Sequence, residues 1–153
     1  MRKREPVLVS ACLLGVACRY DGESRSDEAV RVLAERYWLI PVCPETMGGL
    51  TIPREPCEIV GDRVVSRAGT DVTEQYRRGA QRVLSIARKF GCRAALLKER
   101  SPSCGTGTVH NGKFDGGLTE GYGIAAALLK ENGVAVFGES GLHELVAFLG
   151  GEP

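Results

Sequence analysis

Pro6-Val-Leu-Val-Ser-Ala11 is a short apolar run that ends in the loop Cys12-Leu-Leu-Gly15. A run of this length, bounded by a turn signal, predicts a strand that is buried on both faces. Similar runs follow at Trp38-Leu-Ile-Pro-Val42, Arg93-Ala-Ala-Leu-Leu97 and Val134-Ala-Val-Phe137. The second run contains Pro41, which cannot donate to a strand ladder, so we expect it at a sheet edge, at a bulge or at a strand end.

Helical patterns separate these four runs. Residues 27–36 are predicted to form a helix with Asp27 as its N-cap. The strongest pattern covers residues 71–90, where apolar side chains recur at helical spacing after a start that resembles a capping box, Asp71 with Glu74. A glycine directly after this segment predicts the end of the helix.

The rest of the chain completes an alternation of strands and helices. Further helices are predicted over 119–132 and 141–149, and loops over 44–70 and 99–118, with a minor strand at 63–65 and a small hairpin near 110–113. Alternation of this kind around near-continuous apolar strands predicts an α/β three-layer sandwich with a mostly parallel sheet. We expect a single domain over residues 1–153, which is an ordinary length for one hydrophobic core.

The composition is that of an ordinary globular protein, with 43% hydrophobic and 25% charged residues. Lys and Arg total 20 against 19 for Asp and Glu, so the net charge of +1 gives no broad attraction to nucleic acid or anionic membranes. The apolar run after the charged start is too short for a secretory signal, and no stretch reaches the roughly 18 apolar residues of a membrane span. We therefore expect a cytoplasmic monomer or homodimer without nucleic-acid or membrane partners.

Six cysteines in a reducing cytoplasm point to metal binding, catalysis or core packing before disulfides. Cys12 and Cys43 come directly after the first two predicted strands, and Cys104 lies in the loop after the third. The carboxyl ends of parallel strands share one edge of the sheet, and ligands of such folds bind there. We therefore expect these three thiols to converge on one metal site.

These spacings leave the kind of metal open. Thiols with few histidines, here only His110 and His143, favour zinc or iron–sulfur over magnesium or copper(II). The chain has no Cys-x-x-Cys pair, so it lacks the spacing typical of zinc ribbons and redox dithiols. Cys18 is a candidate fourth ligand, sulfur acceptor or core residue, whereas Cys92 is expected to be a small core side chain.

Four segments, in this order and spacing, form a more specific pattern. They are Val9-Ser-Ala-Cys-Leu-Leu-Gly15 continuing to Cys18-Arg-Tyr-Asp-Gly22, Cys43-Pro-Glu45 with Gly48-Gly-Leu50 and Pro53-Arg54, Gly69-Thr-Asp-Val-Thr73, and Lys98 with Ser101-Pro-Ser-Cys-Gly105. With them the sequence resembles the bacterial thiouracil desulfurase family, formerly a domain of unknown function, from about Val7 to Val136. We therefore expect a single-domain, Rossmann-like three-layer sandwich.

The resemblance also implies a cofactor and an activity. Members of that family bind a [4Fe–4S] cluster through three cysteines and remove sulfur from 2-thiouracil-type bases without net redox chemistry, giving the oxo base and hydrosulfide. By motif, the implied cluster ligands are Cys12, Cys43 and Cys104. The implied catalytic residues are Glu45 and Ser101, with Asp21 as a further candidate.

The chemistry suggests roles for the polar residues. Three cysteine ligands leave one iron of such a cluster open, and an open iron is a Lewis acid that accepts a soft thiocarbonyl sulfur. Glu45 lies two residues from a ligand and is the expected base that activates water to attack the thiocarbonyl carbon. Ser103, Arg54 and Lys98 are expected to bind substrate, the serine by orienting it and the cations by holding a phosphate or neutralising cluster charge.

Two functions without this chemistry stay open. A non-catalytic sulfide or iron–sulfur carrier keeps the three cysteines and has no need of Glu45 or Ser101. A structural zinc protein needs four ligands in closed geometry, so Cys18 or a histidine has to complete its site. The polar residues beside the cysteines favour the enzyme.

Overall fold

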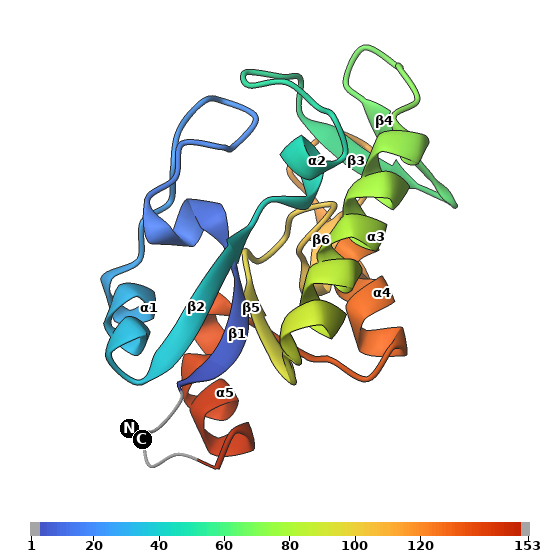
Figure 1. The fold of residues 1–153 in the computed structure, drawn as a ribbon. Helices are drawn as coiled ribbons and strands as arrows, with labels where there is room; N and C mark the ends of the chain where they lie inside the picture. Colours follow the sequence, from blue (N-terminus) through green and yellow to red (C-terminus); the bar gives the residue numbers. More distant parts are fainter. Residues whose placement is uncertain (1–3, 151–153) are drawn as a thin grey trace.

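A computed structural model describes residues 4–150, and its centre is a four-stranded parallel sheet (Figure 1). The strands, in their spatial order, are β2 (Tyr37–Val42), β1 (Glu5–Ser10), β5 (Ala94–Leu97) and β8 (Ala135–Gly138). Neighbouring strands pair in parallel, as the alternation of strands and helices predicts. β2 lies at an edge of the sheet, which is one of the positions that Pro41 allows.

Side chains that alternate along the strands supply a separate core on each face of the sheet. Val7 and Val9 of β1 point to one face, and Leu8 points to the other. All three are fully buried, and each contributes about 1.5–3 kcal/mol of hydrophobic free energy.

Helices cover both faces, which gives the three layers of the predicted sandwich (Figure 1). The first face carries α1 and α5, and the second carries α3 and α4. Their bounds are α1 (Glu28–Val32), α3 (Thr73–Phe90), α4 (Ile124–Glu131) and α5 (Leu142–Phe148). No helix in the described part of the chain is both long and apolar enough to span a membrane.

The predicted helix over 27–36 is α1 followed by a short 3-10 helix, η2 (Leu33–Glu35). Asp27 is its N-cap, as expected, since its carboxylate accepts a hydrogen bond from the Val30 amide at 3.3 Å. In α3 the N-cap is Val72, so Asp71, the predicted cap, lies one residue before the observed capping position. Asp71 accepts instead from the Thr73 amide at 2.9 Å and pairs with Arg63 of the preceding strand.

A short helix, α2 (Pro44–Met47), follows β2 and lies directly on α3. Two glycines allow this close contact. A Cβ atom on Gly79 of α3 would collide with the Pro44 carbonyl, and a Cβ atom on Gly48 would collide with the Gln75 carbonyl. Backbone therefore packs on backbone here, which fixes the position of the residues that follow β2.

Two antiparallel hairpins stand beside the sheet. They are β3 (Cys57–Val60) with β4 (Arg63–Ser66), and β6 (Thr106–His110) with β7 (Leu118–Tyr122). β4 is the predicted minor strand, while its partner β3 falls in a segment predicted as loop. The second hairpin is longer than the one expected near 110–113, because its two strands extend on both sides of that turn.

The helix predicted over 119–132 is wrong at its start, because residues 118–122 form β7. Thr119 and Tyr122 suit a strand, and they pair with Val109 and Thr106 across the hairpin. α4 begins only after Gly123, which packs so closely against the Ser103 backbone that a Cβ atom has no room. The start of α4 is thereby tied to the loop after β5.

Candidate functional site

A cavity of about 520 Å³ opens at the carboxyl edge of the sheet. Its walls come from the ends of β1 and β2, from α2 and α3, from the loop after β5 and from the two hairpins. Cys12 follows β1 in a short 3-10 helix, η1 (Ala11–Leu14), Cys43 follows β2, and Cys104 lies in the loop after β5. The structure therefore places all three cysteines along one cavity, at the edge where the strand order predicts them.

The thiols of this cavity are free and largely shielded from solvent, with Cys12 and Cys104 buried and Cys43 partly buried. Burial raises the pKa of Cys12 to about 11 and the pKa of Cys104 to about 12. Both therefore keep a proton at neutral pH unless a metal replaces it, since a coordinating thiol is deprotonated. In Cys43, hydrogen bonds from the Cys18 thiol and from Thr46 lower the pKa.

Cys18 is a fourth thiol on the cavity wall, and it is 6% exposed. The Cys43 thiol lies 3.8 Å from the Cys18 carbonyl oxygen, and the hydrogen bond between the two side chains raises the pKa of Cys18. Cys57, for which the sequence suggests no partner, also lines the cavity. Cys92 packs in the core under α3 and α4, as predicted.

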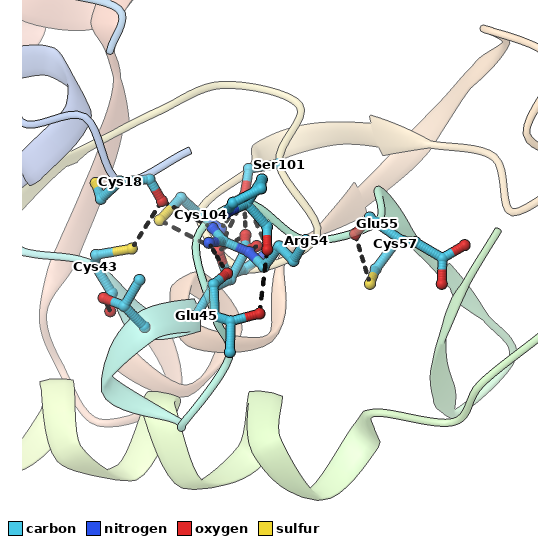
Figure 2. Close-up of polar contacts among 12 residues, drawn as sticks. Cys18, Cys43, Glu45, Arg54, Glu55, Cys57, Ser101 and Cys104 are labelled. Atoms are coloured by element: carbon cyan, nitrogen blue, oxygen red, sulfur yellow. Dashed lines mark hydrogen bonds and ion pairs between the residues drawn. The ribbon is translucent and has the colours of Figure 1, made fainter. Parts of the chain in front are cut away.

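Glu45 is held by several donors in the middle of the cavity (Figure 2). Its Oε1 accepts a hydrogen bond from Arg54 Nε at 3.0 Å, and its Oε2 accepts one from Ser103 Oγ at 2.8 Å. The Glu45 and Arg54 side chains are only 14% and 7% exposed, so water screens this ion pair less than a surface pair. The carboxylate is thereby fixed in one orientation beside the cysteines.

Arg54, expected to bind substrate, has most of its donors taken by protein groups. Besides Glu45 it donates to the Cys18 carbonyl at 2.9 Å and to the Thr51 carbonyl at 3.0 Å. A guanidinium fixed at three points can orient a carboxylate with little entropic cost. The geometry therefore makes Arg54 a positioning residue for Glu45.

The loop that carries Cys104 is built around Ser101. The Ser101 hydroxyl accepts from the amides of Ser103 and Cys104, each at 3.1 Å, which is a local turn of the kind that serine favours. It also lies 3.0 Å from the Ser103 hydroxyl and 3.5 Å from Glu45 Oε2. On the far side, the Ser103 carbonyl accepts from the amides of Ala125 and Ala126 at 2.9 and 3.1 Å, so this loop is anchored to α4.

Two other predicted residues are placed differently. Lys98 lines the cavity, but its ammonium pairs with Glu139 at 3.0 Å. Asp21 is exposed and does not line the cavity. Its carboxylate caps the Glu23 amide at 3.0 Å and lies 3.6 Å from Arg19, which does line the cavity. Direct contact of Asp21 with a ligand has no support in this geometry.

Sequence reasoning missed three residues whose buried polar atoms point to the cavity. Within residues 4–150, the buried side-chain nitrogen and oxygen atoms without a hydrogen-bond partner are Arg19 Nη1, Tyr76 OH and His110 Nδ1. All three residues line this cavity. Buried polar groups are paired in most proteins, so three unpaired ones around a single cavity indicate a place for a polar ligand. In the sequence, Tyr76 is one more apolar position of the α3 pattern, and nothing there marks its hydroxyl.

The structure does not form the closed zinc site that the sequence left open. Among the described residues, no group of three or more His, Cys, Asp or Glu side chains stands close enough to hold one metal ion. A structural zinc ion needs four ligand atoms at about 2.0–2.3 Å from the metal.

Comparison with known proteins agrees with the site. A family model described as 2-thiouracil desulfurase matches residues 7–141. The chain belongs to the 2-thiouracil desulfurase family. The curated relatives of this family member include the uncharacterized protein YbbK of Bacillus subtilis strain 168, 41% identical over 92% of this chain and 99% of that protein.

A solved structure is also similar to this member of the desulfurase family. It is the [4Fe-4S]-dependent thiouracil desulfidase TudS, which is 44% identical and has a TM-score of 0.92. The match covers 96% of this chain and 99% of that one. It confirms the α/β fold predicted from the sequence.

Proposed function

We propose that this protein is an iron–sulfur-dependent desulfurase that removes sulfur from a thiolated pyrimidine of the 2-thiouracil type. The observation that carries the proposal is the meeting of Cys12, Cys43 and Cys104 with a desolvated Glu45 in one cavity. Family membership over residues 7–141 supports it, as does 44% identity to a [4Fe-4S]-dependent thiouracil desulfidase. The free cysteines are consistent with work in a reducing cytoplasm.

The donor set of the cavity fits a [4Fe–4S] cluster. A cluster of this kind takes each thiolate on a different iron, so its ligands stand further apart than the ligands of a single ion. Cys12, Cys43 and Cys104 line one cavity without forming a single-ion site, and they are the residues that would hold the cluster. When bound through three thiolates, the cluster supplies an open iron, a Lewis acid with affinity for soft sulfur.

The protein's own residues supply the base. The Glu45 carboxylate has about four acceptor sites; Arg54 and Ser103 donate to two of them, and Ser101 approaches Oε2 at 3.5 Å. The remaining sites can accept a proton from water and orient its oxygen toward the thiocarbonyl carbon of a substrate in the cavity. Arg54 keeps the carboxylate in place, and Ser103, which precedes Cys104 in the chain, links it to the loop that carries Cys104.

The overall reaction is a hydrolysis that balances without an electron donor. The thiocarbonyl carbon gains the oxygen of water and loses its sulfur, and the two protons of water leave with the sulfur as hydrogen sulfide or its anion. Glu45 holds one of these protons between the attack of water and the departure of sulfur. Ser101, 3.5 Å from Glu45 Oε2, lies next to this proton path and orients Ser103.

Iron counting and turnover test the proposal on protein purified without oxygen. We expect about four irons per chain, and release of sulfide as the thiocarbonyl absorbance of 2-thiouracil disappears. Cys104→Ala should lose both iron and turnover, whereas Glu45→Ala should keep the iron and lose turnover. Cys92→Ala is the matched control, because Cys92 lies in the core away from the cavity, and it should keep both.

The outcomes separate this proposal from the carrier function. Iron and bound sulfide without any turnover of thiolated pyrimidines would favour a carrier. Wild-type protein that binds no iron after anaerobic reconstitution would overturn the proposal.

A further inference from the structure

Tyr76 has the most deeply buried of the unpaired polar atoms around the cavity. Its side chain is 1% exposed, whereas Arg19 and His110 are only partly buried. Its ring packs against Val64 and Val72, which leaves the hydroxyl at the cavity wall without a protein partner. A buried hydroxyl without a partner is destabilising, and a ligand in the cavity that accepts its proton would remove this cost.

The hydroxyl of Tyr76 acts as a hydrogen-bond donor. Burial raises the pKa of this phenol, and the neighbouring Glu45 and Cys57 side chains raise it further, so the proton stays on the oxygen. Glu45 and Cys57 are both near enough to interact with this hydroxyl, but neither forms a hydrogen bond of good geometry with it. Cys57 in turn lies 3.5 Å from the Glu55 carbonyl. The proton of Tyr76 is therefore left for an acceptor inside the cavity.

The cysteines, the Glu45 carboxylate and the Tyr76 hydroxyl line the cavity in an order that matches the polar groups along one edge of a thiopyrimidine ring. Figure 2 shows Cys18, Cys43 and Cys104 at one end, Glu45 in the middle and Cys57 at the other end. Tyr76 packs with Cys57, and both Glu45 and Cys57 act on its hydroxyl, so the hydroxyl belongs to the part of the cavity near these two residues. From one end to the other, the cavity offers a sulfur site, a carboxylate acceptor and a phenol donor.

A thiouracil ring presents the complement of this order along one edge. Its thiocarbonyl, its ring N–H and its remaining exocyclic oxygen stand side by side, whether the sulfur is at position 2 or at position 4. With the sulfur toward the cysteines, the N–H faces a free acceptor site of Glu45, and the oxygen faces the hydroxyl of Tyr76. Arg54 and Ser103 are the close donors to the carboxylate, and Ser101 is a more distant one at 3.5 Å, so an acceptor site is left for this N–H.

We propose that the Tyr76 hydroxyl donates a hydrogen bond to the exocyclic oxygen of the thiopyrimidine and thereby selects oxo substrates. This inference rests on the proposed function and adds a specificity-determining residue to it. If the substrate carries an amino group in place of that oxygen, its N–H faces the O–H of Tyr76 and no hydrogen bond forms between the two donors. If it carries only a hydrogen atom there, the Tyr76 hydroxyl again has no partner. A site built to bond a polar group rejects analogues that lack it.

A cycle of two enzymes and two substrates tests the inference. The enzymes are wild type and Tyr76→Phe, and the substrates are 2-thiouracil and pyrimidine-2-thione, which lacks the exocyclic oxygen. We expect Tyr76→Phe to lower kcat/KM for 2-thiouracil by about 10-fold to 100-fold and for pyrimidine-2-thione by less than about 3-fold. An equal fold-change for both substrates would overturn the inference, because a merely structural role of Tyr76 affects both alike.

Tyr37→Phe is the matched control, because Tyr37 is also buried but lies on β2 away from the cavity. It should leave both substrates unchanged. Calorimetric binding of uracil and pyrimidin-2-one to the same proteins gives a second readout that needs no turnover. A preference for uracil that Tyr76→Phe loses supports the inference, and a preference that survives overturns it. Absence of desulfuration by wild type, by contrast, counts against the proposed function alone.

Discussion

Gly79→Ala sets two physical effects of opposite sign against each other. In the interior of an exposed helix, this change stabilises by about 0.5–1 kcal/mol, because alanine has the higher helix propensity. At Gly79, however, the added Cβ atom collides with the Pro44 carbonyl of α2. The Pro44 carbonyl is part of the backbone and cannot move away by a change of rotamer. Overpacking of this kind costs about 1–3 kcal/mol of stability. We therefore expect a net loss of stability of about 1–2 kcal/mol.

Thermal unfolding of the anaerobically purified protein measures this loss. A destabilisation of 1–2 kcal/mol corresponds to a fall in Tm of roughly 2–8 °C for a chain of this size. Ser85→Ala on the exposed side of the same helix is the control, and it should change Tm little or raise it slightly. A Gly79→Ala variant that is more stable than wild type would refute the backbone contact between α2 and α3.

The same substitution has a consequence for the site. α2 begins directly after Cys43 and contains Glu45, so a shift of this helix moves the proposed cluster ligand and the proposed base together. We expect Gly79→Ala to lower both iron content and turnover, in contrast to Ser85→Ala.

Arg54→Met removes the Nε donor of Glu45 while keeping the apolar stem, and loss of a charge-assisted hydrogen bond of about 1.5–3 kcal/mol should lower kcat roughly 10-fold to 100-fold. Iron content should stay at the wild-type level, and a fall in iron would instead make Arg54 a scaffold of the cluster loops. Asp71→Asn tests pH dependence, because the hydrogen bond from Arg63 holds the pKa of Asp71 well below its usual range. The folded pKa is below the unfolded value of about 3.9, so the stabilisation is present above that pH and is lost as pH falls. Asp71→Asn should therefore lower Tm at pH 7, and the difference from wild type should shrink below about pH 4. A difference in Tm that does not change with pH would contradict this account.

The sheet could be predicted from the sequence because its strands carry their signal locally. Val7, Leu8 and Val9 are buried on both faces, so the run is apolar without interruption, and the same holds for β5. Once the strands and their order along the chain are known, the shared edge of Cys12, Cys43 and Cys104 follows from parallel topology.

The hairpins could not be predicted as well, because their strands owe their form to distant partners. Cys57 to Val60 is a strand only by pairing with residues 63–66, and Leu118 to Tyr122 only by pairing with β6. A helix pattern that runs back from α4 into Thr119 reflects local propensity, and the tertiary pairing overrides it.

The polar residues of the site also divide into those that the sequence places and those that only the folded structure places. Glu45 could be placed near the cysteines because it lies two residues from Cys43. The side-chain partners of Arg54 and the orientation of the Tyr76 hydroxyl depend on packing between segments far apart in the sequence. Asp21 is close to Cys18 in the sequence, but its loop turns the carboxylate toward Glu23 and Arg19.

The anchoring of the Cys104 loop to α4 affects when the site can exist during synthesis. The Ser103 carbonyl is held by the amides of Ala125 and Ala126, and Gly123 fills the space behind it. A chain that ends before α4, as it does for a time during synthesis, lacks the amides that hold this loop. We therefore expect Cys104 to reach its place beside Cys12 and Cys43 only once α4 is present.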